Sequence, residues 1–162
     1  SIINTFQTAE DQANAGEIMR SCPAALEFLQ TIGASGTAAT SQYMGAAPID
    51  ENDWTQDSAF STFNIMVEPQ NQDVYAKAYA RMMNTVAKDV DLRSYGIGTV
   101  YFGRDQFTHW VWTGARSIPE LTSITEKLLT HPAYAAFNEK VGRLRKVVNT
   151  SQNIVLKVYA RQ

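Results

Sequence analysis

Segments with the hydrophobic patterns of strands and of helices alternate between residues 59 and 159, and their order constrains the fold more than any other feature. Residues 59–67 are rich in β-branched and aromatic side chains and end at the turn-forming sequence 68–71, which predicts a strand followed by a turn. Apolar residues then recur every four positions over 72–90. This spacing predicts an amphipathic helix after the strand.

A β-hairpin and a second helical region follow. Residues 98–103 and 108–113 are aromatic and β-branched and flank a short polar segment, a pattern typical of a hairpin. Ser117 and the glutamate three residues after it have the spacing of a capping box, which predicts that a helix begins there. We expect this helix to be interrupted at His131-Pro132, because proline disfavours helical geometry in the residue before it.

The last two elements complete a ferredoxin-like unit. Apolar residues three or four positions apart predict a helix over 134–148, and alternating apolar residues predict a final strand over 154–159. Strand, helix, strand, strand, helix, strand is the βαββαβ order of the ferredoxin-like arrangement. We therefore predict an α+β fold in which helices cover one face of an antiparallel sheet. The other face carries Phe60, Trp110 and Trp112 by strand alternation, and an apolar patch of this size needs a cover.

The N-terminal region is predicted to form a partial repeat of the same kind. The expected elements are a strand over 2–8, a helix over 9–32 that is kinked or interrupted at Pro23, a strand over 36–45 and an exposed loop over 46–58. A weak echo between residues 42–45 and 100–103 supports the repeat. We therefore expect one domain over 1–162, with a βαβ partial repeat and loop over 1–58 and the ferredoxin-like unit over 59–162.

Composition excludes several classes of function. The 162 residues are 44% hydrophobic and carry 14 Lys plus Arg against 16 Asp plus Glu. No run of like charge occurs, so neither nucleic acid nor a membrane surface is an expected partner. No apolar stretch approaches the roughly 20 residues of a membrane span, and we expect a soluble protein. The single cysteine, Cys22, excludes an internal disulfide and is expected to be a buried apolar residue.

The first residue of the chain and its composition suggest a cellular compartment. The chain begins at Ser1 rather than at a methionine, which we interpret as removal of a signal segment or of a tag. Sparse lysine together with abundant Asn, Gln, Thr and Ala favours an exported, periplasmic bacterial protein. A cytoplasmic location is the alternative.

His109 is the candidate catalytic residue. A histidine in this position could act as a general base near neutral pH if it faced a cavity. The alternative is a hydrogen-bonded or solvent-facing strand residue without a chemical role. Strand alternation places His109 with Val111 and Thr113 on one face, and Trp110 with Trp112 on the other.

No metal or cofactor site is expected. His131 could serve as an axial haem ligand, but its place before Pro132 favours a turn or a helix cap. No second His, Cys or carboxylate lies at metal-ligand spacing. The sequence also has no glycine-rich phosphate loop, nucleophile elbow or dinucleotide fingerprint.

The segments 60–67, 108–120 and 131–137 resemble the dimeric α/β-barrel superfamily in element order over about two thirds of the chain. This superfamily includes small cofactor-free monooxygenases, stress-responsive barrel proteins and haem-dependent relatives. The resemblance implies that the open sheet face packs on a second sheet, from a partner chain in a homodimer or from the N-terminal half. The cofactor-free oxygenases use Asn, Trp and Tyr on aromatic substrates, so the implied ligand-binding residues, with His109, are Asn64, Tyr101, Trp110 and Tyr43.

Two functions compete on this basis. The first is a module of α/β-barrel type that binds a small apolar or aromatic ligand or acts by association. The second is a cofactor-free monooxygenase, or a related enzyme, acting on a small aromatic substrate. A cavity into which His109 and a Tyr or Asn converge would favour the enzyme, and a solid aromatic interior would favour the structural role. Haem binding through His131 is a third hypothesis.

Overall fold

The computed structural model describes residues 2–38, 42–103 and 106–157. Contacts within the chain divide it into two compact units, Ser1–Thr40 and Ser41–Gln162. Each is described by itself below. The division into one domain with a boundary at residue 58 stays a prediction.

The N-terminal unit is a pair of helices, α1 (Ala9–Ser21) and α2 (Pro23–Ala34). The interruption predicted at Pro23 is confirmed, and half-buried Cys22 lies between the two helices. The strand predicted over 2–8 is wrong, since residues 2–6 belong to no strand and Thr8 caps α1 by accepting a hydrogen bond from the Asp11 backbone N–H at 3.1 Å. A short strand without a neighbour cannot satisfy its backbone groups, whereas a capping side chain satisfies those of a helix start.

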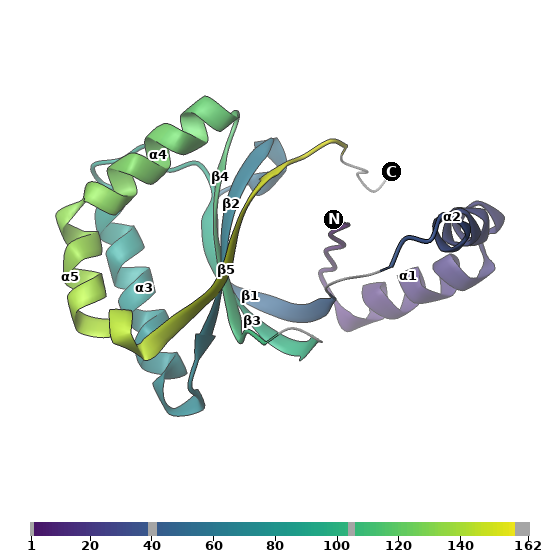
Figure 1. Ribbon diagram of the computed structural model, residues 1–162, viewed down its shortest axis with the longest axis horizontal. Coiled ribbons are helices and arrows are strands. Elements are labelled where there is room, and N and C mark those ends of the chain that lie inside the picture. Colours follow the sequence, from purple (N-terminus) through teal and green to yellow (C-terminus); the bar gives the residue numbers. More distant parts are fainter. Residues whose placement is uncertain (1, 39–41, 104–105, 158–162) are drawn as a thin grey trace. The chain divides into compact units, whose positions relative to one another are not determined.

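The second unit is an antiparallel five-stranded sheet with helices on one side (Figure 1). Its strands are β1 (Tyr43–Glu51), β2 (Ala59–Val67), β3 (Tyr95–Gly103), β4 (His109–Ala115) and β5 (Arg145–Ile154). Its helices are α3 (Gln72–Val86), α4 (Ile118–Thr130) and α5 (Pro132–Val141), with short 3-10 turns at Trp54–Gln56, Pro69–Asn71 and Gly142–Leu144.

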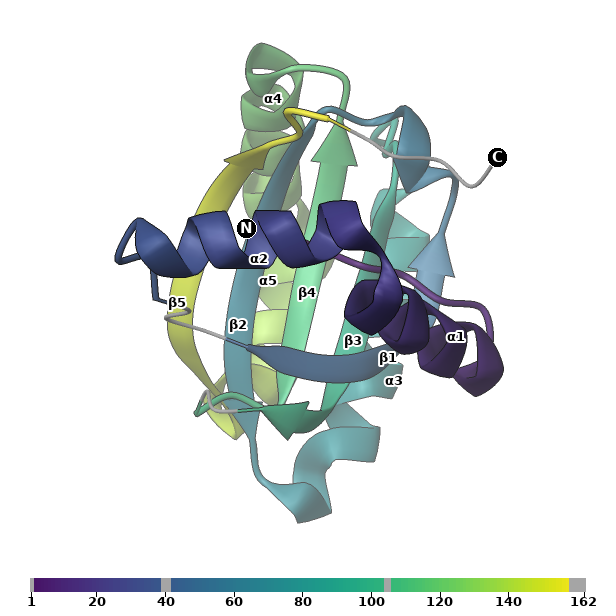
Figure 2. The ribbon, with the colours of Figure 1, turned by 90° about the vertical axis from the view of Figure 1, so that its right-hand side faces the viewer.

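The strand order is β1-β3-β4-β2-β5, and Figure 2 shows β5, β2, β4 and β3 side by side in this sequence. Without β1, this is the order of a ferredoxin-like unit, in which the first and third strands of the unit are central. The predicted fold class is therefore confirmed. β1 extends the sheet by pairing with β3, so it belongs with the second unit.

The core lies between the helices and one face of the sheet. Ile65 and Val67 of β2 and Ile97 of β3 are buried there against the stripe Tyr75, Tyr79, Met82, Met83 and Val86 of α3. Leu121 and Ile124 of α4 and Phe137 and Val141 of α5 complete it. Burial of these side chains is the main source of stability in a chain with one cysteine.

Glycines make room for two tryptophans on the opposite, open face of the sheet. A Cβ on Gly98 would run into the Trp110 indole, and a Cβ on Gly96 would run into the Trp112 indole. A Cβ on Gly45 would come within 2.8 Å of Trp110 Cζ3. The indoles therefore lie over the neighbouring strands, where a larger residue than glycine would displace them.

Two predicted boundaries in the N-terminal half of this unit are wrong. The strand expected over 36–45 begins at residue 43 and continues to residue 51, so much of the expected loop over 46–58 is strand; residues 39–41 lie outside the described part. The loop was predicted partly because of Pro48, since proline has no backbone N–H to donate to the hydrogen bonds between strands. Pro48 lies in a register shift between Ala46 and Ile49, where an irregular strand tolerates it.

The C-terminal prediction is also wrong in its boundaries. α5 ends at Val141, and Val148, which was expected on a helix, lies in β5. The strand expected over 154–159 contributes only Ile154, since 155–157 are not strand and 158–159 lie outside the described residues. Residues 145–154 form a strand because they pair with β2 from Ala59 to Val67. This pairing satisfies the backbone hydrogen-bonding groups of a segment whose side chains are mostly polar.

The predicted start and interruption of the C-terminal helices are confirmed. Ser117 accepts a hydrogen bond from the Glu120 backbone N–H at 3.3 Å, and the Glu120 carboxylate accepts one from the Arg116 backbone N–H at 2.7 Å. His131 separates α4 from α5. The hairpin strands β3 and β4 pair as expected, although residues 104 and 105 of the connection lie outside the described part.

Candidate functional site

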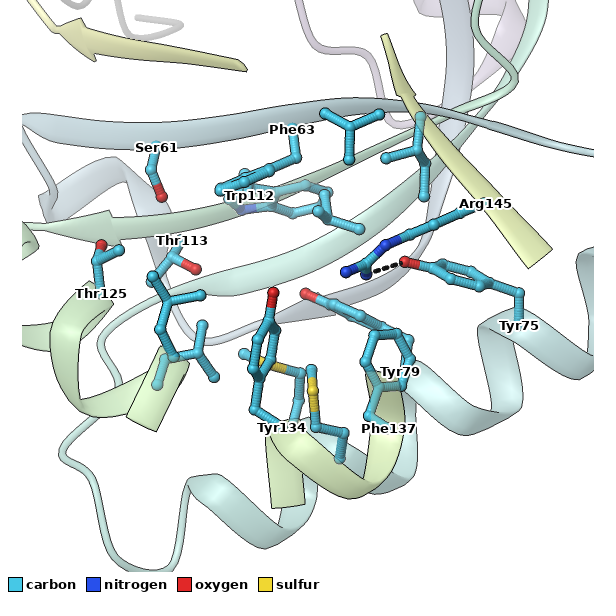
Figure 3. A pocket seen from close by; sticks show the side chains of 17 residues that line it. Ser61, Phe63, Tyr75, Tyr79, Trp112, Thr113, Thr125, Tyr134, Phe137 and Arg145 are labelled. Carbon is cyan, nitrogen blue, oxygen red and sulfur yellow. Dashed lines mark hydrogen bonds between the residues drawn. The ribbon is translucent and has the colours of Figure 1, made fainter. Parts of the chain in front are cut away.

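A small cavity lies between the helix-covered face of the sheet and α3, α4 and α5 (Figure 3). Its volume is about 60 Å³, enough for a few water molecules and well below the roughly 150 Å³ of an apolar cavity that binds benzene. Most of the lining side chains are aromatic or aliphatic. The described lining residues are Ser61, Phe63, Ile65, Tyr75, Tyr79, Met82, Met83, Val111, Trp112, Thr113, Thr125, Leu128, Leu129, Tyr134, Phe137, Arg145 and Val147.

Arg145, the first residue of β5, brings a guanidinium group into this apolar space. Its Nη1 donates to the Tyr75 hydroxyl at 2.8 Å, and its Nη2 donates to Asn138 Oδ1 at 2.8 Å. The guanidinium carbon also lies 5.1 Å from the centre of the Phe137 ring and 5.9 Å from that of Tyr75. Side chains of α3 and α5 therefore hold the group in one orientation (Figure 3).

The charge of Arg145 is not matched by an acid. Among the described residues, the ion pairs of arginines join Arg93 to Asp57 and Arg116 to Glu120, and no Asp or Glu pairs with Arg145. Burial by itself would lower the pKa of the guanidinium, but the phenol groups of Tyr75 and Tyr134 hold that pKa above its ordinary value. The cavity wall therefore carries a fixed positive charge.

Three tyrosines supply hydroxyl groups to the same wall. Burial raises the pKa of Tyr75 in spite of the nearby Arg145, and burial raises the pKa of Tyr79 as well. The Tyr79 hydroxyl donates to the Gly96 carbonyl oxygen at 2.9 Å, while Figure 3 shows the Tyr134 hydroxyl pointing into the cavity. Since burial raises the pKa of Tyr75 and of Tyr79, these two hydroxyl groups are hydrogen-bond donors rather than bases near neutral pH.

The described lining residues include no Asp, Glu or His. Side chains of these types are the usual general bases near neutral pH. A reaction in this cavity that starts from an ionised ligand therefore depends on stabilising the ion rather than on a base among these side chains. Arginine and tyrosine donors suit that task, because both interact more strongly with an anion than with its neutral form.

The predicted catalytic residue, His109, does not line the cavity. It lies on the helix-covered face with 3% of its surface exposed, and its Nδ1 lies 2.8 Å from the Thr108 hydroxyl. Burial lowers the pKa of His109, which keeps the ring neutral at pH 7. The structure thus places His109 on the same face as Val111 and Thr113, as expected from alternation, but Val111 and Thr113 line the cavity and His109 does not.

The other predicted ligand-binding residues lie elsewhere on the sheet. Asn64 pairs in register with Trp110, and alternation puts both on the open face. The Asn64 amide donates to Asn149 Oδ1 at 2.9 Å, and its own oxygen is buried without a hydrogen-bond partner in the described part of the chain. The Tyr43 ring lies 5.3 Å from Trp110, while Tyr101 is exposed. Their roles in ligand binding stay predictions.

Sequence reasoning missed Arg145 because residue 145 was assigned to a helix. A signal for the other cavity residues was present, since Tyr75 and Tyr79 are four residues apart on one helix, and Tyr134 and Phe137 are three apart on another. Such spacing places side chains on one face of a helix. This spacing does not show that β5 places the Arg145 guanidinium between these faces of α3 and α5.

His131 is the N-cap of α5, which confirms the turn or helix-cap role predicted from its place before Pro132. Its Nδ1 accepts a hydrogen bond from the Ala133 backbone N–H at 3.0 Å, and its Nε2 lies 3.1 Å from Asp89 Oδ2. Both ring nitrogens therefore have partners, which does not suit an axial haem ligand. In the described ranges, no three His, Cys, Asp or Glu side chains cluster as a metal site, and no helix is long and apolar enough to span a membrane.

The fold and the cavity define an α+β protein of ferredoxin-like type with a mostly apolar pocket between its sheet and its helices. Solved structures of the same fold are known. One is an anthrone oxidase-like protein, with a TM-score of 0.59 at 15% identity over 91% of this chain and 66% of that chain. No protein-family model and no curated protein matches the sequence.

Two further similar structures are named "putative monooxygenase". The one from Fusobacterium nucleatum has a TM-score of 0.56 at 12% identity over 89% of this chain and 64% of that chain. The one from Lactobacillus acidophilus NCFM has a TM-score of 0.56 at 13% identity over 93% and 66%. The chain thus spans just under two thirds of the length of all three relatives, and at such identities the likeness shows a shared fold.

Proposed function

We propose that this protein binds a small aromatic molecule in the cavity between its sheet and its helices. The observation that carries the proposal is a charged guanidinium, held by Tyr75 and Asn138, in the wall of an otherwise apolar and aromatic cavity. An apolar pocket with a few oriented polar groups is the usual form of a small-molecule site. A wall built only for stability would have no need of this half-buried charge, which has no acidic partner among the described residues.

The names of the structural neighbours favour oxidation of the bound aromatic molecule at this site. We propose that O₂ is the oxidant and that no cofactor is bound, as the resemblance to cofactor-free oxygenases implies. Anthrone is a suitable probe because one of the neighbours is anthrone oxidase-like. In the balanced reaction, anthrone and O₂ give anthraquinone and water. An aromatic ring exceeds the present cavity, so Met82, Met83 or Leu128 has to move to admit it.

A pair of matched serine variants tests the site. Ser61 lines the cavity from β2, whereas Ser151 is exposed on β5. We expect anthrone-dependent O₂ uptake, with one O₂ consumed per anthraquinone formed, to fall at least tenfold in Ser61→Val and to be unchanged in Ser151→Val. Valine suits a strand and fills the cavity with two carbon atoms. Equal uptake by both variants, or no uptake by the unaltered protein, would refute the oxidase proposal.

We also propose that the chain belongs to the dimeric α/β-barrel superfamily and that its open sheet face packs against a second sheet. The half-buried Trp110 and Trp112 and the unpartnered Asn64 oxygen support this, since a covering layer could supply the missing donor. A homodimer is the preferred arrangement, and pairing with the N-terminal half is the alternative. Light scattering on the eluting protein should give twice the mass of 18.0 kDa; a monomer would support the alternative.

A further inference from the structure

The unmatched charge of Arg145 bears on which ligands the cavity accepts. A cation that is partly withdrawn from water, as half-buried Arg145 is, is stabilised by an anion or by several hydrogen-bond acceptors beside it. Here the described partners are the hydroxyl groups of Tyr75 and Tyr134, the Asn138 side-chain oxygen and the faces of two aromatic rings. Such a site is electrostatically incomplete, and a negatively charged ligand would complete it.

The donors of this site are already oriented. The hydrogen bonds to Tyr75 and Asn138 use two of the five N–H groups of the guanidinium, and the contact with the Tyr134 hydroxyl occupies a further one, so donors remain for a ligand. Because the Tyr75 oxygen accepts from Arg145, its own O–H proton is available to a second acceptor. These two adjacent donors, Arg145 on β5 and Tyr75 on α3, can bind one ligand oxygen without losing much side-chain entropy.

Access to the cavity is consistent with a ligand that enters from solvent. Two of its lining residues, Leu129 at the end of α4 and Val147 on β5, are 46% and 44% exposed. β5 is an edge strand, and among the described residues no further strand pairs with its outer side. Arg145 lies two residues before the exposed Val147 on the same strand.

We propose that the cavity selects its ligand as an organic anion, with an aromatic ring against Phe63 and Phe137 and an ionised oxygen, carboxylate or phenolate, on Arg145 and Tyr75. This inference rests on the proposed function and narrows its ligand class. For an acid that arrives neutral, the O–H bond breaks and the proton passes to bulk water. Among the described lining residues Arg145 is the one charged group, and it favours the ionised form of the ligand.

The first experiment compares two probes of the same shape by isothermal titration calorimetry at constant ionic strength. Benzoate is an anion, and benzamide is its neutral counterpart. We expect benzoate to bind about ten to a hundred times more tightly, as for hydrogen bonds between charged groups. Equal binding of the two probes overturns this inference and leaves the proposed function standing. Binding of neither overturns the proposed function together with the inference.

Matched arginine variants show whether the preference comes from the cavity. We expect Arg145→Gln to abolish the preference for benzoate, and Arg143→Gln, at an exposed position two residues earlier, to keep it. Arg145→Lys retains the positive charge and replaces the glutamine variant in this test if that variant does not fold. We expect Arg145→Lys to prefer benzoate over benzamide, but less strongly than the unaltered protein does. An undiminished preference in either Arg145 variant, with the fold verified by circular dichroism, overturns the inference.

A coloured phenol distinguishes the two kinds of anion. The phenolate of 4-nitrophenol absorbs visible light, so its ionisation on the protein can be followed directly. If the site accepts phenolates, the protein should lower the apparent pKa of 4-nitrophenol, and Arg145→Gln should restore the value of the free phenol. Benzoate selectivity without this shift assigns the site to carboxylates. Absence of both results refutes the anion site.

Discussion

Removing the carboxylate of Asp57 should destabilise the protein more than removing any exposed carboxylate. Asp57 precedes β2, and its side chain is 0% exposed. It accepts hydrogen bonds from Arg93 Nε at 2.8 Å and from the buried Ser94 hydroxyl at 2.6 Å. These contacts attach the entry of β2 to the start of β3. Asp57→Ala would leave both donors without this acceptor.

The expected loss of stability in Asp57→Ala follows from the burial of the Asp57 side chain. Breaking a fully buried ion pair costs about 3–5 kcal/mol, but the Arg93 side chain is 26% exposed and can regain part of its hydration. The unsatisfied Ser94 hydroxyl adds about 1 kcal/mol. We therefore expect Asp57→Ala to lower the free energy of unfolding by about 3 kcal/mol.

Urea denaturation, followed by circular dichroism at fixed pH, measures this difference. The matched control is Asp73→Ala, because the Asp73–Lys77 pair is even shorter, at 2.5 Å against 2.8 Å for Asp57–Arg93, but its side chains are 77% and 73% exposed. Exposed pairs contribute about 0–1 kcal/mol, so the control should change little. A loss below about 1 kcal/mol for Asp57→Ala, or equal losses for both variants, would show that burial does not set the strength of these pairs.

Three further predictions test the core and the open face. Tyr79→Phe removes the donor to the Gly96 carbonyl at 2.9 Å and should cost about 1–2 kcal/mol in urea unfolding; an unchanged midpoint would mean that the bond contributes nothing. Because burial lowers the pKa of His109 in the folded state below the 6.5 of a free histidine, the unfolded state binds more protons and the free energy of unfolding should fall as pH drops below about 6.5. His109→Gln should flatten this dependence between pH 6.5 and 5, and an unaltered slope would assign it to other groups. Gly98→Ala should displace the Trp110 indole, lower stability by about 1–3 kcal/mol and shift tryptophan emission, and an unchanged emission spectrum would contradict the packing.

The fold class and several element boundaries could be predicted from the sequence because their causes are local. Residues 59–67 alternate in a strand pattern between turn signals, and this strand has the predicted bounds. Ser117 caps the helix that its spacing with Glu120 predicted, and Pro132 begins a new helix after His131. Each of these depends on side chains within a few residues of one another.

The candidate site depends on contacts between distant parts of the chain and could not be predicted in this way. Arg145 faces the cavity only because its segment pairs with β2 rather than continuing a helix. Its hydrogen-bond partners, Tyr75 and Asn138, come from two different helices. His109, chosen for its residue type, lies on the same face of the sheet but outside the cavity lining.

The sequence by itself determined which segments form most of the strands and helices and which residues alternate across a strand, since these depend on local spacing and on backbone geometry. Only the tertiary structure decided where the edge strands β1 and β5 begin and end, because their backbone groups are satisfied by β3 and β2. The same pairing sets Arg145 among aromatic side chains without an acidic partner in the described residues. The chemistry proposed for this protein follows from that placement.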